Sequence, residues 1–212
     1  MKRELPVRFR EGLGVKPPRA TRLVMGFHRQ RDATQFLSAL RARLEKFGLT
    51  LHPDKTRLIE FGRFADRDRK ARGQRKPESF DFLGFTHVCG KNSKNGRFLV
   101  RRQTSAKRLR AKLQQLKQTL VARRHEPIAV VGVWLRRVVR GYFNYHAIPG
   151  NLLRLGAFRT QVIRYWLRAL RRRSQKHRMT WSRFGPLVER WIPRPQILHP
   201  FPNVRFFANH PR

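Results

Sequence analysis

Acidic residues are scarce in this sequence of 212 residues. It contains 12 Asp and Glu against 50 Lys and Arg, which gives a formal net charge of +38. Between Asp81 and Glu189 the only acid is Glu126, whereas 25 of the 50 basic residues lie in that stretch. A folded domain with this much uncompensated charge repels itself unless it lies against a polyanion. The composition therefore predicts a nucleic-acid partner, and leaves an anionic membrane surface or another polyanion as the lesser alternatives.

Cysteine and long apolar runs are also rare. Cys89 is the only cysteine, which excludes an intrachain disulfide and fits a reducing compartment. His87 lies close to it, but no second Cys/His pair has the spacing of a zinc site, so we expect no metal there. No apolar run approaches the roughly 18–20 residues that cross a bilayer. We therefore expect a cytoplasmic protein that does not associate with membranes.

Clustered carboxylates are missing as well. Metal-assisted phosphoryl transfer usually needs two or three of them close together. Here no two acids are adjacent, and the closest pair, Asp66 and Asp68, lies in a charged stretch. Ser-His-Asp and Cys-His arrangements stay open, because such groups come together only in the fold. We expect no catalytic residue, no metal and no cofactor in this chain by itself.

Hydrophobic residues make up 40% of the chain, with 16 Phe and 4 Trp, which is enough for a core. Residues 1–22 are rich in Arg, Pro and Gly and predict a flexible basic arm. Apolar residues recur every three and four positions over 32–47, which predicts a helix that Asp32 caps and Gly48 ends. The apolar face of this helix consists of Ala33, Phe36, Leu37, Leu40, Leu44 and Phe47.

The next stretch predicts short strands. A strand rich in Leu, Ile and Phe is expected over 57–61, followed by an exposed loop over 63–78. Residues 79–85 predict an apolar strand or a tight turn. Residues 86–101 predict a hairpin, with its turn at 91–96.

Helical periodicity then takes over, with three helices predicted over 104–120, 128–145 and 157–173. Each has one apolar stripe, so the three need one another for burial. A Pro-rich tail, 186–212, is predicted to follow. The expected fold class is therefore α+β, with a small mixed α/β part to about residue 101 and a helical part after it.

Basic residues of these helices lie off the apolar stripes, so we expect them to face solvent. Arg matches phosphate geometry and stacks on bases, and A-form RNA is held through phosphates, 2′-hydroxyls and unstacked bases. The aromatic group from Gly141 to His146 could also stack on bases, although its helical spacing favours a core position for Tyr142, as it does for Trp134. The candidate nucleic-acid-binding residues are Arg101, Arg102, Lys107, Arg108, Arg110, Lys112, Lys117, Arg136, Arg137, Arg140, Arg164, Arg168, Arg171 and Arg172.

From about Leu23 onward, four motifs occur in an order that resembles the C-terminal half of group II intron reverse transcriptase/maturases. They are Phe36-Leu37 through Phe47-Gly48-Leu49-Thr50-Leu51-His52-Pro53-Asp54-Lys55-Thr56, then Phe82-Leu83-Gly84-Phe85, then Leu135-Arg136-Arg137-Val138-Val139-Arg140-Gly141-Tyr142-Phe143-Asn144-Tyr145, and the closing Pro195-Gln196-Ile197-Leu198-His199-Pro200 with Arg205-Phe206. The closing residues look like the tail of one bacterial branch, which implies a bacterial cytoplasm or nucleoid.

The resemblance implies that 23–101 are the last part of a polymerase palm. It implies that 102–185 are the thumb and maturase-specific helices, which hold intron RNA and aid its splicing. Lys55 falls on the family's palm lysine, near the nucleotide phosphates. His146 stands where relatives tend to have another aromatic residue. The turn that grips the primer end is matched by Phe82, Leu83, Gly84 and Phe85.

One departure bears on activity. In the family a Tyr-Ala-Asp-Asp box lies just before the segment matching 23–27, where this sequence has Pro18-Arg19-Ala20-Thr21-Arg22. We therefore interpret the chain as a truncated or frame-shifted copy of a mobile-element protein, inactive as a polymerase alone.

The leading hypothesis is an RNA-binding fragment that grips group II intron RNA. One alternative is the C-terminal half of a split RNA-directed DNA polymerase, which would use Mg²⁺ only when a separate N-terminal half completes it. The other is a generic nucleic-acid-binding protein, for which DNA is an equal partner.

Overall fold

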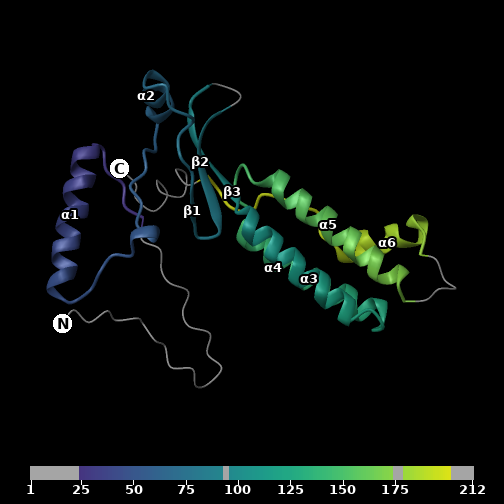
Figure 1. Ribbon diagram of the computed structural model, residues 1–212. Coiled ribbons are helices and arrows are strands. Elements are labelled where there is room, and N and C mark those ends of the chain that lie inside the picture. The colour runs from purple at the N-terminus through teal and green to yellow at the C-terminus, as the bar shows by residue number, and fades with distance from the viewer. Residues whose placement is uncertain (1–23, 93–95, 174–178, 202–212) are drawn as a thin grey trace.

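The computed structural model describes residues 24–92, 96–173 and 179–201 (Figure 1). Over these residues the chain forms six α-helices, one short 3-10 helix and a three-stranded antiparallel sheet, which confirms the α+β class. No helix in the described part is both long enough and apolar enough to cross a membrane. The predicted basic arm, 1–22, and the last part of the predicted tail lie outside the described residues.

Helix α1 (Gln30–Lys46) begins two residues before its predicted start. The predicted cap is wrong, because Asp32 lies inside the first turn and makes no side-chain cap. Its charge there still favours the positive end of the helix dipole. The predicted end is confirmed. Gly48 has a φ of +68°, and the backbone N–H of Leu49 donates to the carbonyl oxygen of Leu44 at 2.9 Å, as in a Schellman closure.

The segment between α1 and the sheet contradicts two predictions. Residues 57–61 are not a strand, because no described strand lies beside them to supply a hydrogen-bonded partner. The predicted loop over 63–78 contains a helix, α2 (Ala65–Ala71), which follows the 3-10 helix η1 (Pro53–Lys55). The charges explain α2, since its acids lie in the first turn and its basic residues in the last, each favourable to the helix dipole.

The sheet has the order β1-β2-β3, with β1 (Phe80–Phe82), β2 (Phe85–Lys91) and β3 (Phe98–Thr104) all antiparallel. The predicted β2–β3 hairpin is confirmed, and β3 continues three residues past its predicted end. The pairing of Phe82 with Phe85 makes residues 79–85 a strand followed by a two-residue turn, so this segment combines the two predicted alternatives, a strand or a tight turn.

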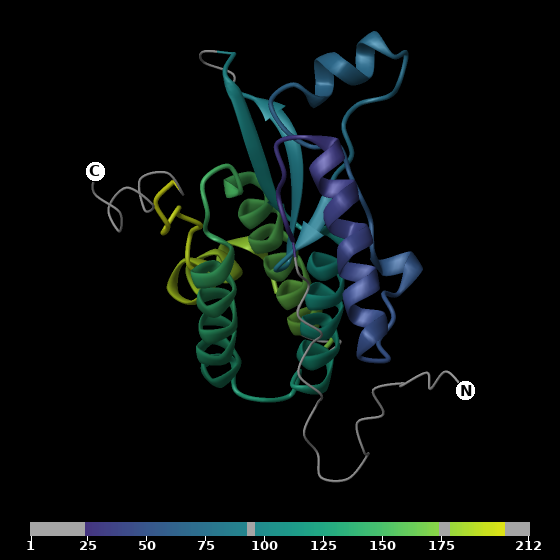
Figure 2. The ribbon, with the colours of Figure 1, turned by 90° about the vertical axis from the view of Figure 1, so that its left-hand side faces the viewer.

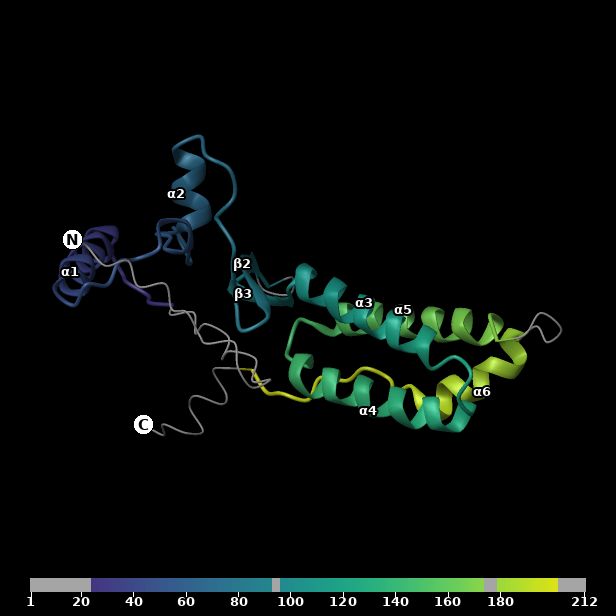
Figure 3. The same ribbon diagram turned by 60° about the horizontal axis from the view of Figure 1, so that its bottom comes forward.

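Four helices form what we call the helical module: α3 (Ala106–Ala122), α4 (Ile128–His146), α5 (Leu152–Arg171) and α6 (Trp181–Trp191). They lie in two layers, with α3 beside α5 and α4 beside α6 (Figure 3). The first two match their predicted ranges within two residues, whereas α5 begins five residues before its predicted start.

The hydrophobic core lies inside this module, and the predicted apolar stripes face it. The stripe of α3 is fully used, with Leu109, Leu113, Leu116 and Leu120 all buried. In α5 the rings of Phe158 and Trp166 have no exposed surface at all. The other members of the core include Val131, Leu135, Val139, Tyr142, Phe143, Leu155, Val162, Leu170, Phe184, Val188 and Ile192.

Helix α6 was not predicted, and the boundary expected after residue 185 falls inside it. Pro186 lacks the N–H that would bond to the preceding turn, which disfavours a helix through Gly185-Pro186. Gly185 has no Cβ to clash with the proline ring, which eases helical geometry at this step. Burial of Phe184 and Val188 offsets the missing hydrogen bond.

Gly132 sets how closely α4 and α6 approach. A Cβ placed on it would lie 2.7 Å from the ring of Trp191, so only a residue without a side chain fits under that indole. The ring therefore lies directly on the backbone of α4.

Helix α1 stands apart from the helical module, and the sheet lies between them (Figures 1 and 3). Figure 2 shows the same arrangement from the α1 side. Of the predicted apolar face of α1 only Ala33 is buried, and Phe47 is 68% exposed. The large hydrophobic residues exposed between residues 24 and 64 are Val24, Met25, Phe27, Phe47, Leu49, Leu58 and Phe64.

Candidate nucleic-acid interface

The fourteen candidate basic residues lie on β3, α3, α4 and α5. The two on β3 are Arg101 and Arg102; five belong to α3, three to α4 and three to α5, and Arg172 follows directly as the C-cap of α5. All are exposed except Arg102 and Lys112, which are half-buried. Burial lowers the pKa of Arg102, which is the direction expected when a cation loses water. The structure therefore brings twelve of the predicted cations to the surface on a rigid scaffold.

None of these fourteen residues forms an ion pair within the described part of the chain. The two acids of the helical module are held by other arginines. Glu126 pairs with Arg123 at 2.8 Å, and Glu189 pairs with Arg159 at 3.4 Å and Arg194 at 3.1 Å. The positive charge of the fourteen is therefore not neutralised by the fold.

Five basic residues between 57 and 72 differ from these fourteen, because each of the five forms an ion pair with an acid. Arg57 pairs with Glu78, and both Arg69 and Arg72 reach Glu60. The remaining pairs there are Lys70 with Asp66 at 3.0 Å and Arg67 with Asp68 at 2.9 Å. Ion pairs are thus concentrated along 57–78, whereas the basic residues of α1, like the fourteen on β3 and the helices, have no acidic partner among the described residues.

The cations of α3 divide between two flanks of the helix. At 100° per residue, Arg110 and Lys117 lie on one side of the buried leucine stripe, and Arg108 and Lys112 lie on the other. The sequence predicted only that these residues lie off the stripe. The second flank reaches the sheet, because a Cβ on Gly84 would lie 3.5 Å from Arg108 Cδ.

A strained turn joins β1 to β2. Leu83 and Gly84 have φ values of +46° and +85°, as a type I′ turn requires, although a leucine costs about 1–2 kcal/mol in this conformation. The hydroxyl of Tyr145 donates to the carbonyl oxygen of Leu83 at 2.6 Å, and the backbone N–H of Ser105 donates to that of Gly84 at 3.0 Å. These bonds hold Leu83 in place with 63% of it exposed.

Of the four predicted primer-grip residues, the structure exposes only Leu83. Phe85 is buried, Gly84 is covered, and Phe82 is half-buried. Phe85 stacks on Tyr145 with ring centroids 5.7 Å apart. A neighbouring nucleic acid would therefore meet Leu83, Tyr145 and Arg108 at this turn.

A buried polar cluster fastens the end of β3 to the start of α5. The backbone N–H of Thr104 donates to Asn151 Oδ1 at 3.0 Å, and Asn151 Nδ2 donates to Thr104 Oγ1 and to the carbonyl oxygen of His146, both at 2.8 Å. Asn151 and Thr104 have almost no exposed surface. This cluster fixes the orientation of the sheet against the helices.

His146 sits in an aromatic cage. Its ring lies 4.3 Å from that of Tyr142 and 5.2 Å from that of Phe85. Burial, aided by the nearby charge of Arg108, lowers the pKa of His146 to about 4, so the ring is neutral at physiological pH. Burial also raises the pKa of Tyr142 to about 12. The predicted core position of Tyr142 is confirmed, while Trp134 is half-buried beneath the guanidinium of Arg123.

Lys55 is exposed as the last residue of η1. Among the described residues its side chain forms no hydrogen bond or ion pair that would link it to the fourteen basic residues. Cys89 is half-buried against Gly62, and burial raises the pKa of its thiol. No group of three or more His, Cys, Asp or Glu among the described residues is placed to hold a metal ion.

Sequence reasoning missed the surface aromatic Trp181, and it named Tyr145 only within the aromatic group 141–146, without its contact to the β1–β2 turn. Tyr145 reaches a carbonyl 62 residues away along the chain, a contact that no local pattern signals. Trp181 begins a helix that was not expected.

Compared with known proteins, the chain matches no protein-family model, no curated protein and no solved structure. The residues themselves therefore carry the functional inference.

Proposed function

We propose that this chain binds structured RNA through the exposed cations of β3 and the helical module, and that it does so without catalysing phosphoryl transfer by itself. The observation that supports this is the set of fourteen basic residues on rigid elements, none with an acidic partner in the described chain. When unpaired basic side chains on helices contact phosphates, they displace the counterions condensed on the nucleic acid, and this release favours binding.

RNA is favoured over DNA by the mixture of groups on this surface. Arginine and exposed aromatic residues grip phosphates and unstacked bases, whereas reading duplex DNA needs an element that enters the major groove. The resemblance to group II intron maturases adds a substrate to this proposal, namely intron RNA, with 102–185 as the thumb and maturase-specific part. It also assigns residues 23–101 to the end of a polymerase palm.

Salt dependence tests the proposal. If six to ten phosphates are contacted, the affinity for a structured RNA should fall by ~10³–10⁵ between about 50 and 200 mM salt. Replacing Arg164, Arg168 and Arg171 together by Gln should lower the magnitude of the log–log salt slope by about 2, since each lost phosphate contact removes ~0.7–0.9. Fluorescence anisotropy with labelled RNA measures both values.

The matched control removes the same charge from paired positions. Replacing Arg57, Arg67 and Arg72 by Gln also lowers the net charge by three, yet each of these arginines pairs with an acid. The control should leave the salt slope within error of the original. Equal loss in both variants would place the interface elsewhere. Equal competition by duplex DNA at matched salt would favour a generic nucleic-acid binder.

A second candidate function follows from the exposed apolar residues between Val24 and Phe64. Surfaces of this kind mark interaction sites, which favours a protein partner for the α1 region, such as a separate N-terminal half of a split polymerase. Lys55 would then lie near the nucleotide phosphates. Primer extension by the two polypeptides together, with Mg²⁺, tests this idea. Absence of extension, when the halves copurify, would leave RNA binding alone.

A further inference from the structure

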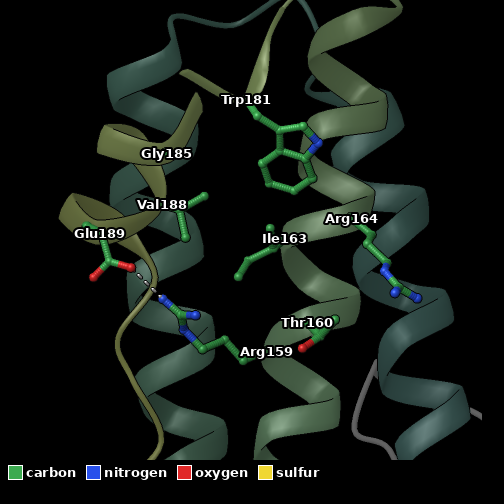
Figure 4. Close-up of a pocket in the computed structure, with 8 residues that line it drawn as sticks. All are labelled: Arg159, Thr160, Ile163, Arg164, Trp181, Gly185, Val188 and Glu189. Carbon is green, nitrogen blue, oxygen red and sulfur yellow. Dashed lines mark hydrogen bonds and ion pairs between the residues drawn. The ribbon is translucent and has the colours of Figure 1, made fainter. Parts of the chain in front are cut away.

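A groove of about 510 Å³ lies between α5 and α6, within the range of ~300–1,000 Å³ typical of ligand sites. Its walls come from Arg159, Thr160, Ile163 and Arg164 of α5 and from Trp181, Gly185, Val188 and Glu189 of α6. Figure 4 shows Trp181, Ile163 and Val188 pointing into the space between the two helices. The groove therefore has an apolar floor and one large aromatic wall.

Trp181 is exposed, although its ring is anchored to the core. It is 58% exposed and is one of the two tryptophans of α6. Its ring packs edge-on against Phe184 at 5.6 Å, and Phe184 packs edge-on against the buried Trp166 at 5.3 Å. The indole is thus anchored through two rings to the core, while much of its surface stays free.

The charges around the groove favour an anionic ligand. Glu189 is the only acid among the lining residues, and it pairs with Arg159 (Figure 4) and with Arg194. One of them, Arg159, also donates to the carbonyl oxygens of Ile192 and Pro193, so it is committed to the fold. Arg164 is the free cation at the edge, on the far flank of α5 from Trp181 in Figure 4.

We propose that this groove takes the base of one unpaired RNA nucleotide, stacked on Trp181 above Ile163 and Val188, while the RNA backbone crosses α5 toward Arg164. The proposal rests on the RNA binding proposed above and specifies what that surface distinguishes. An aromatic side chain beside a free arginine is the combination that holds splayed-out bases in RNA-binding proteins. The groove would give this chain a preference for bulges and loops over continuous duplex.

The experiment compares two RNA hairpins that differ by a single bulged nucleotide, at matched salt. The full chain should bind the bulged hairpin about fivefold more tightly or better, the lower end of what stacking of one base supplies. Trp181→Ala should abolish this preference, and Trp181→Phe should keep part of it. Trp181→Leu keeps apolar bulk but has no aromatic face, so it should behave like the alanine variant.

The salt slope separates the two proposals. All Trp181 variants should bind the plain hairpin as the original does, with an unchanged slope, because no phosphate contact is removed. Leu153→Ala, which truncates an 89%-exposed side chain of α5 outside the groove, is the matched control and should keep the preference. Equal affinity for the two hairpins, or a preference that survives both Trp181→Ala and Trp181→Leu, overturns the base pocket alone. If the original chain shows no salt-dependent binding to either hairpin, the proposed RNA binding is overturned as well.

Discussion

The region before the sheet and the helical module use their hydrophobic residues in opposite ways. Residues 24–64 expose seven large apolar side chains and bury one alanine of α1, whereas the module buries Trp166, Phe158 and Phe184 completely. Ion pairs are also unevenly placed, since they are concentrated along 57–78, whereas the candidate arginines on α3 to α5 have no acidic partner among the described residues. The helical module buries a core of its own, so its surface residues are available to bind a ligand. The region before the sheet has no such core, so its apolar residues need a binding partner to cover them.

The largest expected effect is on stability, and it tests this comparison at two phenylalanines, one in each region. Phe158→Ala should destabilise the protein by about 3–5 kcal/mol, because a fully buried ring leaves a cavity. Phe47→Ala, at a position 68% exposed on α1, should change stability by less than about 0.5 kcal/mol. Urea denaturation of the two variants gives both values. Similar losses would mean that the α1 region has a core of its own.

Acid should weaken the place where the sheet meets the module. The folded-state pKa of His146 is about 4, below its ordinary value of 6.5, so folding favours the neutral ring. This stability is complete above pH 6.5 and is lost as the pH falls from 6.5 through 4, by an amount on the order of 2–3 kcal/mol. The midpoint of urea unfolding should fall over this window. His146→Gln should flatten the change, and an unaltered pH profile in that variant would remove His146 as its cause.

Asn151 gives a sharper test of the same junction. Asn151→Asp keeps the shape and one acceptor but cannot donate to Thr104 Oγ1 or to the carbonyl oxygen of His146. Leaving buried acceptors unpaired should cost about 1–3 kcal/mol. The exposed Asn144, changed in the same way, is the control and should lose little. Hydrogen exchange should show faster opening at the end of β3 in the Asn151 variant, and uniform protection would show that the cluster is not what fastens the sheet.

The smallest expected effect is a gain. Leu83→Asn places the residue preferred at the first position of a type I′ turn before Gly84, and Asn adopts positive φ more readily than Leu. Stability should rise by about 0.5–1 kcal/mol, as a thermal melt would show, since little of Leu83 is buried. A simultaneous loss of RNA affinity would show that the strain at this turn serves binding.

The sequence predicted the parts of this fold that depend on local periodicity. The leucine stripe of α3, the stripes of α4 and α5, and the glycine closure of α1 all follow from residues within one or two turns of each other. The outward direction of the arginines follows from the same pattern. Residues 86–101 were predicted as a hairpin because their turn chemistry is local too.

The errors lie where distant residues decide. Residues 57–61 have strand composition, but a strand also needs a partner edge, which no local pattern supplies. Helix α6 was hidden by Gly185-Pro186, because local rules count the missing hydrogen bond and cannot count the core that Phe184 and Val188 enter. The groove beside Trp181 needs both α5 and α6 in place, so no single stretch of sequence could reveal it.

The contact between Gly132 and Trp191 determines which positions of this chain are free to vary. On the RNA surface proposed above, exchanging any one of the fourteen basic residues would remove one phosphate contact at most. At Gly132 even a methyl group would collide with an indole 59 positions further along the chain. A diverged homologue should therefore be sought by a glycine paired with a distant tryptophan, and only afterwards by the positive charge around them.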